Sequence, residues 1–400
     1  MKLDSLTTMP SERRTWRGRI KLAVLLFFCA PLFAVHRIAF ALDGILFPQL
    51  RRAKEFDAIF IVGMPRSGTT LAHRLITAQR DRFTAMPLWE LLFAPALCQK
   101  RLFLRLHHLD SLFGSFVTRA VEGLVERMAA QTKHIHSTGL FEAEEDQIGL
   151  MPFDGCFLRV IPFPKSDYSW QLGQFATRLP DGQRRYLLDA YLGLIRRHLA
   201  FRGSERIYVS KTPGFLTWIP LLKQSIPSAR FVFTQRDAAR CVASQLSSVE
   251  SEIRSFGFDL RSPQILDPFL DLLTHYQHIV ETSVEHFRSA PSQQAFVLPY
   301  KQLTRSPHRA IQAMLRHFEI ECTLSDSKRL ADAAITNSRY RSKHHYSMSD
   351  YPIPAERLEK LFKTNPEPAT NLSRTPSLRL NEGNEPNEFL SPLSGPNRKV

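Results

Sequence analysis

Short, nearly continuous hydrophobic runs alternate with helical periodicities from residue 57 onward. The runs are rich in β-branched or aromatic residues, and each ends in glycine or a polar residue; they read DAIFIVG, RIYVSKT, ARFVFTQR and QAFVLPY. Helices are expected at Asp267–Phe287 and Pro307–Phe318. Strands that are apolar on both faces are typical of a parallel sheet covered by helices on both sides. The pattern therefore predicts one α/β domain over residues 55–362.

The N-terminal segment, residues 1–54, has a different pattern. A basic cluster precedes the uncharged run Leu22–Val35, whose fourteen residues are fewer than the roughly 20 that a membrane span needs. His36 and Arg37 interrupt the run, and Asp43 lies inside the next apolar stretch. Three interpretations remain open: a helix on the membrane surface, a true span, and a buried helix of a soluble domain. We expect a membrane-associated protein with a cytoplasmic catalytic domain, and a single-pass protein is the alternative.

The C-terminal segment, residues 363–400, contains six Pro and six Asn and little periodic apolar content. Such a composition does not provide enough apolar surface to form a core. The sequence therefore predicts a disordered tail.

Charge and cysteine content limit the possible partners. The net charge of +15 favours anionic partners, and residues 1–54 alone hold ten Lys or Arg against three Asp or Glu. No zinc-finger spacing or RNA-binding aromatic motif accompanies this charge, so nucleic acid is not expected as a partner. The five cysteines lie far apart and form no CxxC pair, and no metal site is expected.

The segment GMPRSGTT, residues 63–70, lies between a predicted strand and a predicted helix. Its glycines have the G-x4-G spacing of a phosphate-binding loop, which predicts a P-loop-type sheet, but Thr69 occupies the position of the usual lysine. Backbone N–H groups and the helix dipole converge on an anion in such a loop. Arg66 and the hydroxyls of Ser67, Thr69 and Thr70 would add donors. This smaller counter-charge suits a single phosphate group better than a triphosphate with magnesium.

A second candidate anion site follows the run ARFVFTQR. Arg236 ends this predicted strand, Asp237 is a plausible helix N-cap, and Ser244 falls about two turns along the next helix. Arg236 and Ser244 would together bind a phosphate. The alternative is an Arg236–Asp237 ion pair with a serine on the helix surface.

These residues resemble the sulfotransferases that use 3′-phosphoadenosine 5′-phosphosulfate (PAPS), especially the branch with a P-R-S-G-T-T loop that includes bacterial members and tyrosylprotein sulfotransferases. The resemblance runs from about Phe60 to Phe362, and one departure is Arg236-Asp237-Ala238 where relatives usually read R-D-P. Its strongest parts are VGMPRSGTTLAHRL, MPLWELLFAP, SKTPGFLTWIPLLKQSIPSARFVFTQRDAARCVAS, LPYKQLTRSP and KHHYSMSDY. It implies PAPS as donor without a metal. It also implies that Arg66, Ser67, Gly68, Thr69 and Thr70 hold the 5′-phosphosulfate, and that Arg236 and Ser244 hold the 3′-phosphate.

The resemblance also assigns catalytic candidates. It implies that Arg66 stabilises the leaving phosphate and that Glu90, in PLWELLF, is the general base; a helix-edge carboxylate paired with an arginine is the alternative for Glu90. For three further groups of residues, both a role at the site and a purely structural role are possible interpretations. They are the acidic cluster Glu142–Asp146 with Glu145 and Asp146 beside the acceptor, Lys211 at a strand end, and Lys343, His344, His345 and Tyr346 over the nucleotide.

The expected function is transfer of a sulfuryl group to a hydroxyl or amine of a lipid, glycan, protein or small molecule. Two alternatives remain: a P-loop nucleoside or small-molecule kinase, and a non-catalytic nucleotide-binding protein at the membrane. The missing loop lysine argues against the kinase.

Overall fold

The computed structural model describes residues 14–50, 55–129, 139–290, 292–338, 348–354 and 356–357. All of them belong to the compact unit Met1–Asn365, and the predicted tail 363–400 lies outside the described residues. The helices are α2 (Trp16–Leu46), α3 (Thr69–Thr77), α4 (Leu88–Leu92), α5 (Leu97–Leu112), α6 (Phe116–Ala129), α7 (Asp167–Gly173), α8 (Phe175–Arg178), α9 (Asp181–Arg202), α10 (Ile219–Ser225), α11 (Ala238–Ser255), α12 (Pro263–Ser289), α13 (Tyr300–Arg305), α14 (Pro307–His317) and α15 (Leu324–Ser338). Short 3-10 turns are η1 (Pro48–Leu50), η2 (Asp146–Phe153), η3 (Phe157–Val160), η4 (Pro213–Trp218) and η5 (Met348–Asp350).

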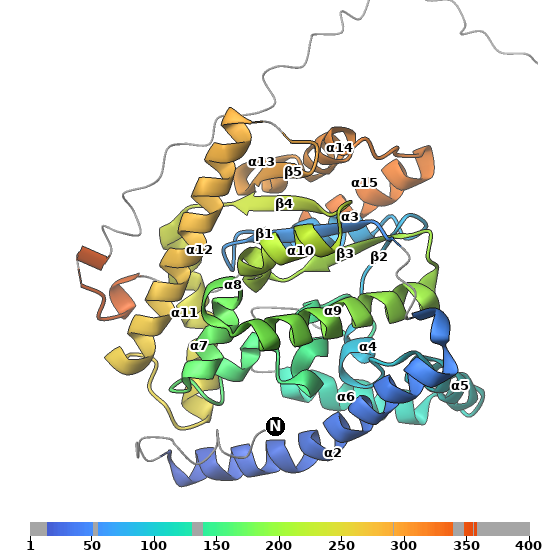
Figure 1. The fold of residues 1–400 in the computed structure, drawn as a ribbon, viewed down its shortest axis with the longest axis horizontal. Helices are drawn as coiled ribbons and strands as arrows, with labels where there is room; N and C mark the ends of the chain where they lie inside the picture. The colour runs from blue at the N-terminus through green and yellow to red at the C-terminus, as the bar shows by residue number, and fades with distance from the viewer. Residues whose placement is uncertain are drawn as a thin grey trace, which may run out of the picture. The chain divides into compact units, whose positions relative to one another are not determined.

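Five parallel strands form one sheet with the order β2-β3-β1-β4-β5 (Figure 1). They are β1 (Ala58–Gly63), β2 (Phe83–Thr84), β3 (Ile207–Lys211), β4 (Arg230–Gln235) and β5 (Ala295–Pro299). The fold class expected from the sequence is confirmed. The two-residue edge strand β2 was not predicted, because so short a run has no distinctive pattern. The central strand β1 is buried along its whole length, which explains its continuous apolar sequence.

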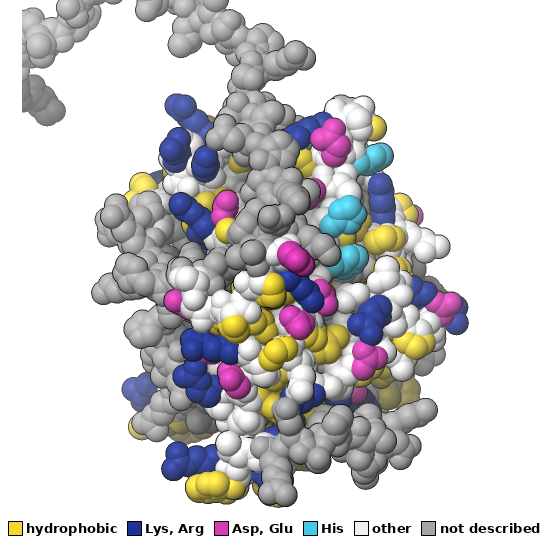
Figure 2. All heavy atoms as spheres, turned by 90° about the vertical axis from the view of Figure 1, so that its left-hand side faces the viewer, with side chains coloured by type: hydrophobic (Ala, Val, Ile, Leu, Met, Phe, Trp, Pro, Cys, Tyr) yellow, Lys and Arg dark blue, Asp and Glu magenta, His cyan; other side chains and the backbone are white. Residues whose placement is uncertain are grey.

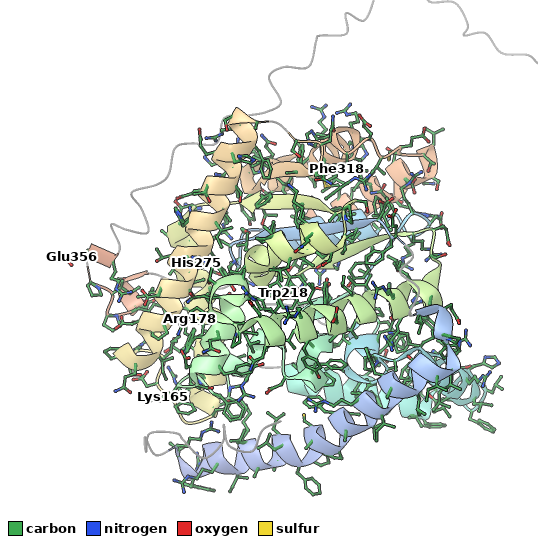
Figure 3. The ribbon with its side chains drawn as sticks, viewed as in Figure 1. Lys165, Arg178, Trp218, His275, Phe318 and Glu356 are labelled. Atoms are coloured by element: carbon green, nitrogen blue, oxygen red, sulfur yellow. The ribbon has the colours of Figure 1, made fainter. Side chains whose placement is uncertain are left out.

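Helices cover both faces of the sheet and form two hydrophobic cores. The larger core includes Phe60 and Trp218, and Trp218 stacks on Phe175 with ring centroids 3.5 Å apart. The smaller core packs α3 and α14 against the opposite face and includes Ile61 and Phe318. Figure 3 shows Trp218 and Phe318 on opposite sides of the strands. The alternation of inward side chains along β1 thus supplies both cores.

The N-terminal helix α2 runs beside the domain and contacts η2 and α5. It is one continuous helix of 31 residues despite Pro31 and the polar pair that interrupts the apolar sequence. By length and composition it is the one helix of the described residues that could cross a membrane, with a mean hydropathy of 2.0 over its most apolar window. Its buried residues include His36 and Asp43, so polar positions face the protein.

Candidate active site

The loop between β1 and α3 depends on two glycines with positive φ. Gly63 has φ 151°, and a Cβ there would lie 2.3 Å from Oγ1 of Thr234 on β4. Gly68 has φ 101°, and a Cβ there would lie 2.9 Å from the ring of Tyr300. Arg66 also adopts the left-handed region, with φ 68°, which is uncommon for a residue with a side chain. The backbone therefore takes a tight path that brings α3 to the carboxyl edge of the sheet.

Ser67 builds the loop rather than facing a ligand. Its side chain is fully buried, its hydroxyl donates to the Met64 carbonyl, and its Oγ lies 2.5 Å from Oγ1 of Thr234. The first backbone N–H groups of α3, at Thr69 and Thr70, have no acceptor within the helix. Together with the helix dipole they form an anion-binding end at the loop.

Two arginines and a serine meet beside this loop. Nε of Arg66 donates to Oγ of Ser244 at 3.1 Å, and Nη1 of Arg236 donates to the Arg66 carbonyl at 2.8 Å. The Arg236 guanidinium also lies 4.3 Å from the centroid of the Tyr300 ring. Asp237 is the N-cap of α11, as predicted. Its carboxylate accepts a hydrogen bond from the backbone N–H of Arg240 rather than forming an ion pair with Arg236. The structure thus brings Arg66, Arg236 and Ser244 together at one edge.

The carboxyl end of β3 contributes a third charged group. Lys211 lies opposite Ile61 of β1, two residues before the loop, and its side chain is only 1% exposed. Its Nζ lies 3.5 Å from Oε2 of Glu144 and 3.7 Å from Oε1 of Glu145. The acidic cluster predicted from the sequence is therefore anchored at the same edge of the sheet as the loop.

The environment of Glu145 raises the pKa of its carboxyl group. Burial is the largest cause, the neighbouring Glu144 adds to it, and Lys211 opposes it. The Glu145 side chain is still 24% exposed, in contrast to a fully buried carboxylate such as Asp146. Lys211 also affects His73, on α3. Burial and the charge of Lys211 lower the pKa of His73 to about 3, so its imidazole is neutral. This edge therefore holds a basic carboxylate beside a cation.

Asp146 has a different role from its neighbours. Its side chain is buried, and it accepts hydrogen bonds from the hydroxyls of Tyr191, Tyr208, Ser210 and Thr212. A buried carboxylate with four donors is a structural centre that fixes η2 against α9 and β3. The acceptor-side role expected for Asp146 has no support in this geometry.

Glu90 is enclosed by two cations and a histidine whose pKa is lowered by burial. Its carboxylate is 0% exposed, and its oxygens lie 2.8 Å from Nζ of Lys100, 2.7 Å from Nδ1 of His198 and 2.8 Å from Nη2 of Arg202. Burial opposes its ionisation, but these neighbours hold the pKa of Glu90 well below its usual range. Such a carboxylate is a weak base, and its contacts lead to α5 and α9. The alternative reading of Glu90, a carboxylate paired with an arginine, agrees with this arrangement, and the general-base role stays a prediction that the geometry does not favour.

Two contributors to the site were missed in the sequence. Thr234 fixes Ser67, and Tyr300 covers Gly68 and the Arg236 guanidinium. Each lies at or just after the carboxyl end of a predicted strand, and that position was the available signal. Lys343, together with His344, His345 and Tyr346, lies outside the described residues. Among the residues that the structure describes, no group of three His, Cys, Asp or Glu side chains could hold a metal.

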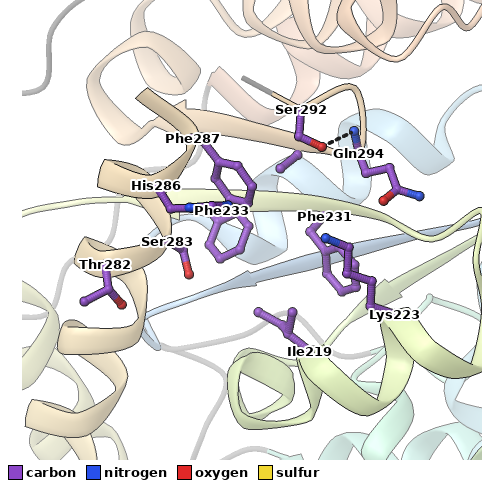
Figure 4. Close-up of a pocket in the computed structure, with 11 residues that line it drawn as sticks. Ile219, Lys223, Phe231, Phe233, Thr282, Ser283, His286, Phe287, Ser292 and Gln294 are labelled. Carbon is purple, nitrogen blue, oxygen red and sulfur yellow. Dashed lines mark hydrogen bonds between the residues drawn. The ribbon is translucent and has the colours of Figure 1, made fainter. Parts of the chain in front are cut away.

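The cavity in Figure 4 lies elsewhere. It has a volume of about 260 Å³ and is lined by α10, α12, β4 and the residues at the start of β5, including Lys223, Phe231 and His286. Phe231 pairs with Ala295, the first residue of β5, so this cavity is remote from the carboxyl edge. In open parallel sheets ligands bind at the carboxyl ends of the strands. We therefore place the candidate site at the loop.

The fold and the loop define an α/β protein of the P-loop type, with a phosphate-binding edge that lacks the usual lysine. The sequence profile of the sulfotransferase family matches residues 58–324, and the chain belongs to that family. It is a transferase, and the expected resemblance is confirmed. Sequence comparison with curated proteins gives no significant match.

Two solved structures share the fold. Sulfotransferase STF1 from Mycobacterium tuberculosis H37Rv is 16% identical, with a TM-score of 0.66 over 90% of this chain and 89% of its own. Sulfotransferase STF9 from Mycobacterium avium is also 16% identical, with a TM-score of 0.67 over 90% of this chain and 87% of its own. At this identity the likeness concerns the fold alone.

Proposed function

We propose that the chain transfers a sulfuryl group from PAPS to a hydroxyl or amine acceptor. The observation that carries the proposal is the junction of Arg66, Arg236 and Ser244 beside a loop without lysine. This donor set fits PAPS, which has a 5′-phosphosulfate and a separate 3′-phosphate but no triphosphate. The guanidinium groups and the Ser244 hydroxyl are suited to bind phosphate oxygens, and the Tyr300 ring holds Arg236 in place.

The donor supplies an activated sulfuryl group, whose sulfur–oxygen bond to phosphate breaks as the acceptor oxygen or nitrogen bonds to sulfur. The N-terminus of α3 and Arg66 stabilise the charge that develops on the leaving phosphate. The acceptor proton passes to a carboxylate of the Glu144–Glu145 pair. Glu145 suits this task because its pKa is raised and its side chain is partly exposed. Lys211 lies beside both carboxylates and opposes the rise of the Glu145 pKa.

Glu90 is the second candidate for the base. We propose that it instead stabilises the domain, since its oxygens already contact the cations of Lys100 and Arg202 and the imidazole of His198, and its side chain is 0% exposed. The two assignments predict opposite effects on turnover and on stability for substitutions at Glu90 and Glu145.

Calorimetric titration of the detergent-purified full chain with PAP, the desulfated donor, tests the proposal. ADP and ATP with magnesium are the controls. We expect micromolar PAP binding without metal and much weaker ATP binding, because Thr69 replaces the loop lysine that would bind a γ-phosphate. Binding of ATP with magnesium and not of PAP would overturn the sulfotransferase mechanism and favour a kinase. Tight PAP binding without transfer to any acceptor in a broad screen would favour a nucleotide-binding protein.

A further inference from the structure

Helix α2 has its apolar side chains on the outside. Only 11% of its most apolar window is buried, and Phe27 is 74% exposed. Its most exposed large apolar side chains are Trp16, Phe27, Phe28, Ile38, Ile45 and Leu46. A surface helix of a soluble domain has the opposite arrangement, with its apolar side against the core. The outward face of α2 therefore fits an apolar environment.

The polar residues of α2 attach it to the domain along its length. Lys21 donates to Ser255, Arg37 donates to the Pro152 carbonyl, and His36 contacts Gln99 at 3.2 Å. Asp43 accepts from Nε of Arg197 at 2.8 Å. Near the start of the helix, Gly18 packs so closely that a Cβ would lie 2.3 Å from the Phe256 carbonyl oxygen. A helix held by these contacts lies along the domain rather than standing away from it.

Helices α5 and α6 extend the exposed apolar surface, and capping joins them to α2. The Asp43 carboxylate also accepts from the backbone N–H groups of Leu97 and Cys98 at 2.6 and 2.9 Å, at the start of α5. Asp110 of α5 in turn caps α6. The exposed apolar residues of α5, α6 and their turn include Leu102, Leu106, Leu109, Leu112, Phe113 and Phe116. We call the exposed side of α2, α5 and α6 the apolar face; the three helices lie at the bottom of Figure 1.

The exposed charged side chains of α2 and α5 are cationic, whereas α6 also contains the acidic residues Glu122 and Glu126. Arg17, Arg19, Arg101, Arg105 and Arg119 are exposed on the apolar face. Three of these arginines lie over aromatic rings, those of Trp16, Phe47 and Phe116. In α2 and α5 the acidic residues are Asp43, which is buried, and Asp110, which caps α6. By contrast, Figure 2 shows basic and acidic side chains interspersed on the face near α12.

We propose that the apolar face docks on a bilayer with anionic headgroups, with α2 parallel to the surface. Aromatic and aliphatic side chains enter the acyl boundary and the arginines contact lipid phosphates. A spanning α2 would have to leave the domain, which would separate the buried Asp43–Arg197 pair and uncap α5. The contacts that join the three helices and the excess of exposed arginines on α2 and α5 favour a lipid surface over a protein partner.

A fluorescent reporter distinguishes this arrangement from a lone spanning helix. The chain has four tryptophans, of which Trp89, Trp170 and Trp218 are buried and Trp16 is 66% exposed. In a Trp16→Phe background, Leu109→Trp places a reporter on α5. With vesicles of two parts phosphatidylcholine and one part phosphatidylglycerol that carry brominated acyl chains, we expect this reporter to be quenched. The matched control, Ile335→Trp on α15, should not be quenched. Equal fluorescence of the α5 reporter with and without bromine would overturn the proposal.

A binding experiment supplies a second measurement. Leu109→Glu with Phe113→Glu should lower flotation with the same vesicles at least tenfold, while Leu324→Glu with Ile335→Glu should leave it unchanged. Circular dichroism establishes that each variant is folded. PAP titration tests nucleotide binding separately from flotation, so a loss of nucleotide binding is distinguished from a loss of membrane docking. Unchanged flotation of the α5 variant would mean that α2 anchors the chain alone. If the chain forms dimers without lipid and the α5 variant is monomeric, the apolar face would instead bind a second copy of the chain. Both results would contradict the proposal.

Discussion

Two buried charge clusters lie on neighbouring elements and differ in how fully they are paired. In the Glu90 cluster one carboxylate contacts two cations and a histidine and has no exposed surface. In the Glu144–Glu145 cluster two carboxylates share Lys211, and Glu145 is 24% exposed. Pairing lowers the pKa of Glu90, whereas burial beside another acid raises the pKa of Glu145. Complete pairing stabilises a fold, and incomplete pairing leaves a group able to exchange protons.

The largest effect is expected at Glu145. Glu145→Gln should lower turnover roughly 10²–10⁴-fold, the usual range for loss of a general base, while PAP affinity is retained. Steady-state rates with an acceptor and calorimetry with PAP measure the two quantities. Glu142→Gln is the matched control, because Glu142 is 55% exposed and pairs with Arg74. Turnover undiminished by Glu145→Gln would remove Glu145 from the mechanism.

Glu90 tests the other half of the comparison. Glu90→Gln leaves the buried Lys100 and the partly buried Arg202 without their anion and should lower the free energy of unfolding by about 3–5 kcal/mol. Because the folded-state pKa of Glu90 is lowered, its contribution is present above the ordinary glutamate pKa and is lost as pH falls through the depressed value. Urea unfolding at neutral pH measures the effect, with the exposed Glu285→Gln as control. A variant of normal stability that has lost turnover would restore Glu90 as the base.

A substitution of Arg236 tests the proposed phosphate site at the carboxyl edge of the sheet. Arg236→Ala should weaken PAP binding by about 2–4 kcal/mol, because a charge-assisted phosphate contact is lost. Calorimetry measures the change, and Arg240→Ala on the exposed side of α11 is the control. Unchanged affinity in a folded Arg236→Ala protein would place the nucleotide elsewhere.

The smallest effect concerns pH. Glu145 must be deprotonated to accept a proton, so activity should rise as pH increases through its raised pKa. Lys211 lowers that pKa, and Lys211→Met should therefore move the acid limb of the kcat profile to higher pH. The pH dependence of kcat measures the shift. A uniform fall in kcat with an unmoved limb would indicate that Lys211 acts on the transferring group instead.

The sequence predicted the sheet and the loop because both are encoded locally. Apolar runs mark β1, β3, β4 and β5, and GMPRSGTT marks the loop between β1 and α3. The partners of Glu90 and Glu145 were not predictable in this way. Lys100, His198 and Arg202 reach Glu90 from helices up to 112 residues away, and their pairing depends on tertiary packing.

The N-terminal helix shows the same limit. Its hydropathy indicated contact with a membrane, but the sequence left a surface helix, a span and a buried helix open. Which side faces lipid depends on Arg197 and the start of α5, which lie far along the chain. Periodicity within one segment does not contain that information.

The double role of Asp43 has a practical consequence for protein production. Removing a hydrophobic N-terminal helix is a common way to obtain a water-soluble enzyme. Here the deletion would remove the Asp43 carboxylate, which caps α5 and neutralises Arg197. It would also expose the surface of η2 that α2 covers. A protein that lacks the residues up to Phe47 would therefore be less stable and more prone to aggregate. Solubilising the intact chain with detergent or lipid nanodiscs is the better route.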